Sequence, residues 1–182
     1  MATYVKRSVL RPDGNPGNGI TLKDKIVVID IDDIDTFPSR DEAGVLIAEA
    51  LTLKASAVPV YLYLTPGTVE VTSNVEGDPD AMGFNVSIKG NHPGNSQEVR
   101  EFKWNWLGRK CIIIVDYCDG RDADLLGTPC NPMQMSSNFT ANKDMTRTEF
   151  SFASITKGMD IAIYQGAIPA DPGTPDKSEA GV

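Results

Sequence analysis

The sequence has few of the residues on which metal and nucleophilic chemistry most often depend. Its 182 residues include one histidine, His92, and three cysteines. Cys111, Cys118 and Cys130 form no CxxC pair, and a zinc site would need a fourth ligand that only His92 could supply. We therefore expect free thiols, as in a reducing compartment, and no zinc site. A Ser–His or Cys–His catalytic pair would also have to use His92, which lies in the turn-like run GNHPGN.

Long apolar segments and an excess of positive charge are lacking as well. No apolar run approaches the ~18 residues that cross a bilayer, and the N-terminus MATYVKRSVL has no signal-peptide core. We expect a soluble chain with no membrane partner, not secreted through a cleaved signal. The 17 basic and 25 acidic residues give a net charge of −8, which disfavours binding to nucleic acid and to anionic membranes.

What is present is the composition of a folded, turn-rich protein. Hydrophobic residues make up 41% and charged residues 23% of the chain, near the usual globular mix. Sixteen glycines and 12 prolines favour many turns. We expect one β-rich domain over residues 1–168, with a loop arm at 11–19 and a polar tail at 169–182 that has little to bury.

Strand patterns occupy most of this domain, because β-branched and alternating apolar residues recur in short runs separated by turn residues. The Thr65-Pro66-Gly67 turn predicts a hairpin between the strands expected at residues 58–64 and 68–75. Strands are expected at residues 3–10, 25–31, 58–64, 68–75, 84–89, 110–117, 132–139, 147–155 and 160–168.

Two segments are expected to be helical. Ser39 and Glu42 form a capping box before an apolar stripe, which predicts a helix over residues 39–53. A second helix is predicted over 96–108, although its aromatic residues also alternate at the period of a strand. Since strands dominate both halves, we expect a mainly β (α+β) fold: a β-sandwich or barrel with one or two flanking helices.

The run IVVIDIDDID is the best candidate for catalysis. An apolar strand ending in Asp30 and Asp32 is similar to the first motif of phosphotransferases that use an aspartate nucleophile and Mg²⁺. Such enzymes also need a lysine, a Ser/Thr motif and distal acids on a parallel α/β sheet, whereas this chain is rich in β-strands. The acids that could imitate the distal pair are Asp116, Asp119, Asp122 and Asp124. We therefore interpret the run as a strand entering a solvated acidic loop, and expect no enzyme.

Other site chemistries find equally little support. The acids at 30–35 lack the ligand spacing and the central glycine of an EF-hand, and Glu76, Asp78 and Asp80 alternate within an ordinary turn; calcium binding by these acidic loops stays open. The aromatic run Phe102–Trp106 resembles a base-stacking surface, but neighbouring glutamates and the net charge oppose nucleic-acid binding. We expect those aromatic residues to serve core packing or a subunit contact. No cofactor and no metal site are predicted.

A resemblance to a known class is carried by the second half of the chain. The runs GNHPGNSQEVREFKWNWLGRKCIIIVDYC, LLGTPCNPMQ and RTEFSFASITKGMDIAIYQGAI resemble virion structural proteins of tailed phages. The resemblance covers roughly residues 83–168, and the chain looks most like a major tail protein, the subunit of the tail tube. Alternative structural roles are a head–tail connector ring, a capsid decoration protein and the tube of a contractile injection system. The remaining alternative is a metal-dependent phosphohydrolase using Asp30 and Asp32.

The resemblance implies a structural role rather than catalysis. Tail tube subunits self-assemble into stacked rings, here expected to be hexameric, that form the DNA-ejection conduit of a virion assembled in the bacterial host cytoplasm. Their strands would join a continuous inner barrel, other virion proteins would be partners, and DNA would pass without specific binding. The candidate lumen-facing acids are Asp30, Asp32, Asp33, Asp35, Glu76, Asp78 and Asp80.

Overall fold

The computed structural model describes residues 4, 6–14, 17–19 and 21–172, and its described elements are almost all strands. They are β1 (Lys25–Asp30), the short 3-10 helix η1 (Ile31–Asp33), β2 (Ile34–Thr36), β3 (Leu46–Ile47), β4 (Thr52–Leu53), β5 (Val60–Tyr63), β6 (Glu70–Glu76), β7 (Gly83–Pro93), α1 (Gln97–Asn105), β8 (Lys110–Val115), β9 (Ala123–Leu126), β10 (Met133–Ala141), β11 (Thr146–Ser154) and β12 (Ala162–Tyr164). The expected mainly β fold is therefore confirmed. The helices within the described ranges are too short and too polar to cross a bilayer.

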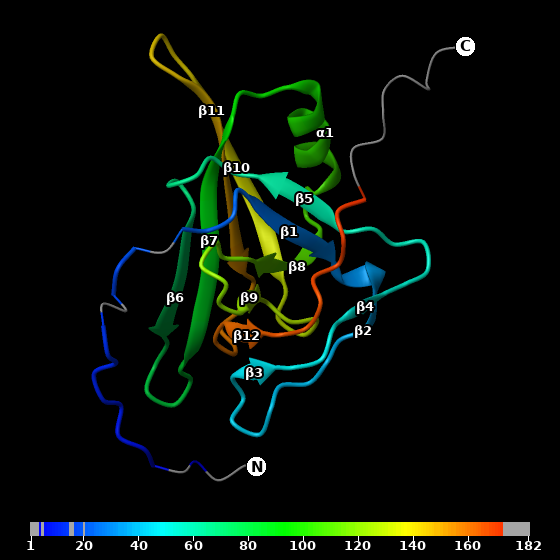
Figure 1. Ribbon diagram of the computed structural model, residues 1–182. Helices are drawn as coiled ribbons and strands as arrows, with labels where there is room; N and C mark the ends of the chain where they lie inside the picture. Colours follow the sequence, from blue (N-terminus) through cyan, green and yellow to red (C-terminus); the bar gives the residue numbers. More distant parts are fainter. Residues whose placement is uncertain (1–3, 5, 15–16, 20, 173–182) are drawn as a thin grey trace.

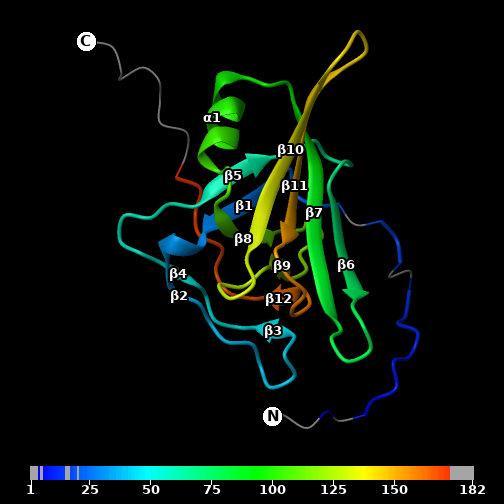
Figure 2. The same cartoon turned by 180° about the vertical axis from the view of Figure 1, so that it is seen from behind.

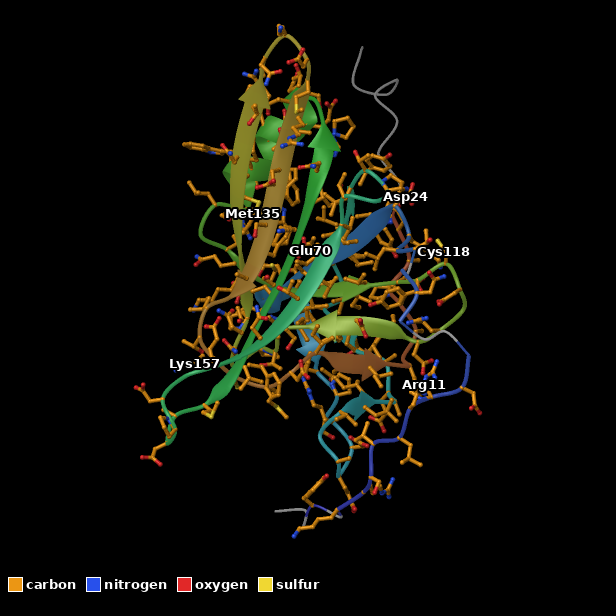
Figure 3. The ribbon with its side chains drawn as sticks, turned by 90° about the vertical axis from the view of Figure 1, so that its left-hand side faces the viewer. Arg11, Asp24, Glu70, Cys118, Met135 and Lys157 are labelled. Atoms are coloured by element: carbon orange, nitrogen blue, oxygen red, sulfur yellow. The ribbon has the colours of Figure 1, made fainter. Side chains whose placement is uncertain are left out.

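Strand β8 divides the ten-stranded sheet into two layers. One edge of β8 pairs with β1, and its other edge pairs first with β10 and then with β9. We call β5, β1, β8, β9, β12 and β3 the cross layer, and β10, β11, β7 and β6 the long layer. Strands of the two layers run in crossing directions (Figures 1 and 3), as in orthogonally packed sheets. The result is sandwich-like.

Two apolar cores result from the alternation of side chains along β1 and β8. Ile26, Val28 and Ile113 face the long layer and form one core with Phe150 and Phe152. Their neighbours in the chain point the other way and form the second core, which includes Val27, Ile29, Ile112, Ile114, Leu125 and Tyr164. Burial on both faces explains why KIVVID and KCIIIV read as continuous apolar runs rather than as alternating ones.

The helix predicted over residues 39–53 is wrong. The Asp41 carboxylate accepts hydrogen bonds from the backbone N–H groups of Val45 (2.9 Å) and Leu46 (3.0 Å), and Gly44 adopts a φ of +78°. These contacts close a turn, after which β3 pairs in parallel with β12. The apolar residues of the expected stripe are still used, because Ile47 and Leu51 cover the second core from an extended backbone.

The predicted hairpin between the strands at 58–64 and 68–75 is also wrong. Strand β5 pairs with β1 in the cross layer, whereas β6 pairs with β7 in the long layer. The turn at residues 65–67 carries the chain from one layer to the other, and the Thr65 N–H donates to the Asn91 carbonyl (2.7 Å). The turn residues thus predicted where the chain changes direction, but not which strands pair with each other.

Helix α1 lies within the range predicted for it and flanks the first core (Figure 2). Val99 and Trp106 are buried, and Phe102 stacks on Trp106 and meets Phe150 edge-on. Trp104 points away from this core and is 79% exposed.

Several boundaries also differ from those predicted. Residues 4 and 6–10 form no strand, and the remainder of the strand predicted at 3–10 lies outside the described residues. Strand β9 was not predicted, and β7 runs on to Pro93 through a segment expected to be a turn.

The ends of the domain are described in part. Of the loop arm predicted at 11–19, residues 11–14 and 17–19 are described and form no helix or strand. Of the polar tail, residues 169–172 are described: the Tyr61 hydroxyl donates to the Pro169 carbonyl (2.6 Å), and Asp171 forms an ion pair with Lys25 (3.5 Å). The first residues of the tail therefore lie against β5 and β1, and the rest lies outside the described residues.

Candidate functional site

The acids at residues 30–35 surround the junction of β1 and η1, where Asp30 is the buried member. Its side chain is 9% exposed, accepts a hydrogen bond from the Asp32 N–H (3.0 Å) and forms an ion pair with Arg109 (2.8 Å). The hydrogen bond and the charge of Asp30 raise the pKa of the Arg109 guanidinium. Asp32, Gly108 and Lys110 complete a shallow hollow here. Asp30 thus caps η1 and neutralises a cation, which is a structural use of the carboxylate.

The acids that could imitate a distal catalytic pair do not converge on this hollow. Asp116 forms an ion pair with Lys23, and Asp119 forms one with Arg121 (2.6 Å). Asp124 accepts a hydrogen bond from the Tyr117 hydroxyl. Burial raises the pKa of Asp124, and burial with the Asp124 hydrogen bond raises the pKa of Tyr117. Asp122 accepts from the amide of Gln165 (2.9 Å).

The second acidic group lies at the turn between β6 and β7, away from the first. Glu76 ends β6 and accepts a hydrogen bond from the Asn85 amide (3.3 Å), while Asp78 and Asp80 lie in the turn. Figures 1 and 2 place this turn and η1 on opposite sides of the molecule. The acids proposed from the sequence to face a lumen, Asp30, Asp32, Asp33, Asp35, Glu76, Asp78 and Asp80, therefore form two separate groups.

His92 and the cysteines have structural surroundings. His92 lies in β7, not in the expected turn; its Nδ1 is 2.9 Å from the Tyr63 carbonyl oxygen, and its ring meets Tyr63 and Phe150 edge-on. All three cysteines are free, as the sequence predicted. Cys111 is buried, and burial raises the pKa of its thiol to about 12, so it is not a reactive thiolate at neutral pH. Across the described residues, no three His, Cys, Asp or Glu side chains are grouped to hold a metal ion.

The outer face of the long layer is a broad polar surface. Core residues such as Met135, Phe152 and Ile88 alternate along these strands with side chains that point the opposite way. The outward residues are Gln134, Ser136, Asn138 and Thr140 on β10; Arg147, Glu149, Ser151 and Ala153 on β11; Asn85, Ser87, Lys89 and Asn91 on β7; and Glu70, Thr72, Asn74 and Glu76 on β6. Most of them are uncharged hydrogen-bonding residues.

Contacts across this face join its side chains to one another. The hydroxyls of Thr72 and Ser87 lie 2.7 Å apart, and Lys89 forms an ion pair with Glu70 (3.0 Å). With Lys89 neutralised in this way, Arg147 is the other cation among the outward residues. Such a surface offers little to a phosphate backbone, because non-specific affinity for DNA comes mainly from Lys and Arg contacts.

Both edges of the long layer lack a strand partner among the described residues. Strand β6 ends the sheet, and β10 pairs with β8 only through Met133 and Gln134, which leaves residues 135–141 open along one edge. Neither strand contains proline, lysine or a bulge, and β10 contains no charged residue. Soluble monomers usually protect edge strands with such features. Phe139 (42% exposed) and Val75 (57% exposed) stand at these two edges.

This polar face with two open edges is the feature that the sequence alone did not predict. Alternation in EVTSNVE and QMSSNFTA marked two strands with one polar side each. Which strands share a sheet depends on pairings between distant segments, and no local signal carries that information. Comparison with protein-family models, with curated proteins and with solved structures finds no match for this chain.

Proposed function

We propose that this chain is a structural protein of a phage virion, a tail tube subunit that self-assembles into stacked rings around a DNA-ejection conduit. The observation that carries the proposal is the long layer: a four-stranded sheet with a polar outer face, an open edge on each side and the rest of the domain packed behind it. Copies joined edge to edge would place that domain outside and the polar face inside, because the described residues pack against the other face of the long layer and leave this one uncovered.

Closure into a ring also suits the geometry of the strands. A head-to-tail contact between two different edges generates a ring if the rotation closes. Six copies would contribute 24 strands, and at the usual strand spacing and tilt such a barrel is roughly 50 Å across at its backbone. Barrels of this size leave an aqueous channel rather than a packed interior. A channel lined with Ser, Thr and Asn would allow DNA to slide without specific binding.

The positions of the acidic residues bear on what would keep DNA from binding to the wall of such a channel. Glu76 lies on the polar face, and Asp78 and Asp80 follow it in the adjoining turn. Asp30, Asp32, Asp33 and Asp35 belong to β1, η1 and β2, outside the long layer whose polar face would line such a ring. In this proposal the scarcity of free cations on the polar face, more than a wall of acids, keeps DNA from binding.

Electron microscopy of the purified full chain tests the proposal. We expect rings at moderate concentration and stacked tubes about 100 Å or less across at high concentration, the width of such a barrel with the domains packed around it. Single rings that never stack would favour a head–tail connector, and a chain that stays monomeric at high concentration would contradict self-assembly. Tubes that assemble equally well and are found in particles without a genome would favour an injection system over a tail.

A further inference from the structure

We propose that β10 of one copy pairs antiparallel with β6 of the next copy, in a register that sets Met135 opposite Val75, Ser137 opposite Ser73 and Phe139 opposite Val71. The occupant of each open edge is thus a second copy of this chain. The inference rests on the proposed function in that it names the contact by which the rings would close.

The strand directions permit this contact. Every neighbouring pair in the long layer is antiparallel, so β10 and β6, at its two ends, run in opposite directions. A junction between the β10 edge of one copy and the β6 edge of the next therefore continues the same antiparallel pattern. An odd number of strands would have produced a parallel junction instead.

The two faces restrict the register. A slip by one residue exchanges the faces of a strand, and would turn Val71 and Val75 toward the polar surface. Registers that keep the faces differ by two residues. The proposed one joins apolar to apolar side chains at Met135–Val75 and Phe139–Val71. A shift by two in one direction would set Phe139 opposite Ser73 and Val75 opposite Ser137. A shift by two in the other direction would set Met135 opposite Ser73 and Ser137 opposite Val71, and would bring Val75 to Met133, which already pairs with β8. Side-chain pairs directly across a ladder each contribute roughly 0.2–1 kcal/mol, so such matching selects one register.

The polar face and the ends of the strands agree with the same register. Ser136 would lie opposite Asn74, and Asn138 opposite Thr72, with no like charges in contact. The open edge of β10 ends at Met135, because Gln134 already pairs there with the exposed Lys110 of β8. Glu76 follows Val75 and would therefore come next to Lys110. A carboxylate at the end of one copy's β6 would therefore meet an ammonium group beside the other copy's β10.

Disulfide trapping in the full chain tests this register. In a Cys118→Ser, Cys130→Ser background, which removes the exposed native thiols, one variant carries Asn74→Cys with Ser136→Cys, the proposed opposite pair. Its matched control carries Asn74→Cys with Asn138→Cys, a diagonal pair roughly 7–8 Å apart, beyond the ~3.5–4.5 Å between Cβ atoms that a disulfide needs. A third variant, Ser73→Cys with Ser137→Cys, tests the adjacent pair, because one of two adjacent pairs has the closer spacing.

After mild oxidation, we expect a ladder of covalent multimers from one or both opposite pairs, collapsing to monomer on reduction, and little or none from the diagonal pair. A ladder from the diagonal pair alone would overturn the register. Rings in the microscope without a ladder from either opposite pair would overturn the junction while leaving the proposed function intact. A ladder without rings or tubes would leave the junction standing and remove the conduit. Neither ladder nor rings at high concentration would overturn both.

Discussion

Tyr117 and Asp124 link burial to alkaline stability. The raised pKa of Tyr117 means that the unfolded chain releases this proton first as pH rises, because an unperturbed tyrosine titrates near pH 10. This contribution to folding is complete below about pH 10 and is lost as pH rises above it. We expect Tyr117→Phe to weaken the decline of the free energy of unfolding as the pH rises above about 10, measured by urea denaturation.

The same substitution has a separate cost at neutral pH. Asp124 would lose the hydroxyl that donates to it, and a partly buried acceptor left unsatisfied costs about 1–2 kcal/mol. Tyr4→Phe is the matched control, since Tyr4 is 77% exposed and its ring packs on little. Equal pH profiles for Tyr117→Phe and the unmodified chain would contradict the assignment.

Asp30 distinguishes the structural use of a carboxylate from catalysis. Asp30→Ala removes the cap of η1 and should lower the free energy of unfolding by about 1–2 kcal/mol, whereas Asp30→Asn keeps an oxygen for the Asp32 N–H and should cost less. Urea denaturation measures both. A phosphatase screen with Mg²⁺ tests the alternative function. A phosphatase activity of the unmodified chain that Asp30→Asn abolishes would contradict the structural role of Asp30 and favour a metal-dependent phosphohydrolase.

Among the elements, the segment before β4 matters because it covers the second core without forming a helix. Ile47 in β3 is fully buried there with Leu51 and Tyr164. We expect Ile47→Ala to cost about 2–5 kcal/mol in thermal or urea unfolding, since it leaves a cavity. Val45→Ala, at a position 50% exposed two residues earlier, should change stability by about 0.5 kcal/mol or less. Similar losses at both positions would mean that this segment does not seal the core.

The sequence predicted those elements whose signals are local. The sequence patterns that predicted β1, β8 and α1 each lie within a few residues, and these elements formed nearly where expected. The helix prediction for residues 39–53 was wrong because Ile47 and Leu51 can reach the second core either from a helix or from a bent extended chain. Gly44 and the Asp41 turn decide between them.

Long-range pairing set the limit for the candidate site. The alternation of polar and apolar residues predicted strands at β6 and β10. Their position at the two ends of one layer follows instead from the pairing of β10 with β11, of β11 with β7 and of β7 with β6. Two of these pairs join neighbouring strands through short turns, whereas β11 and β7 meet across more than fifty residues of chain. A polar face with two open edges could therefore not be derived from local patterns.

At the scale of the whole molecule, the net charge of −8 and the polar face are different properties. The acids gather at the β1–η1 junction, at the β6–β7 turn and in the segment before β9, whereas the long layer exposes mainly Ser, Thr and Asn. Non-specific DNA affinity depends on where cations lie, not on the total charge alone. A conduit built from this chain would thus depend on the long layer, and the acids outside that layer would serve solubility or contacts away from the channel.

Placing a cation on the polar face tests that division. We expect Asn138→Lys to give the assembled protein a measurable affinity for a short DNA duplex at low salt, because six copies would set a ring of ammonium groups in the channel. The logarithm of the binding constant should fall against the logarithm of salt concentration with a slope of about −0.9 for each phosphate contacted, as read by fluorescence anisotropy. Val58→Lys, at a position 57% exposed outside the long layer, is the charge-matched control. If both variants bind DNA equally, net charge governs the affinity and the polar face is not the lining; if only Asn138→Lys binds, the long layer faces the DNA.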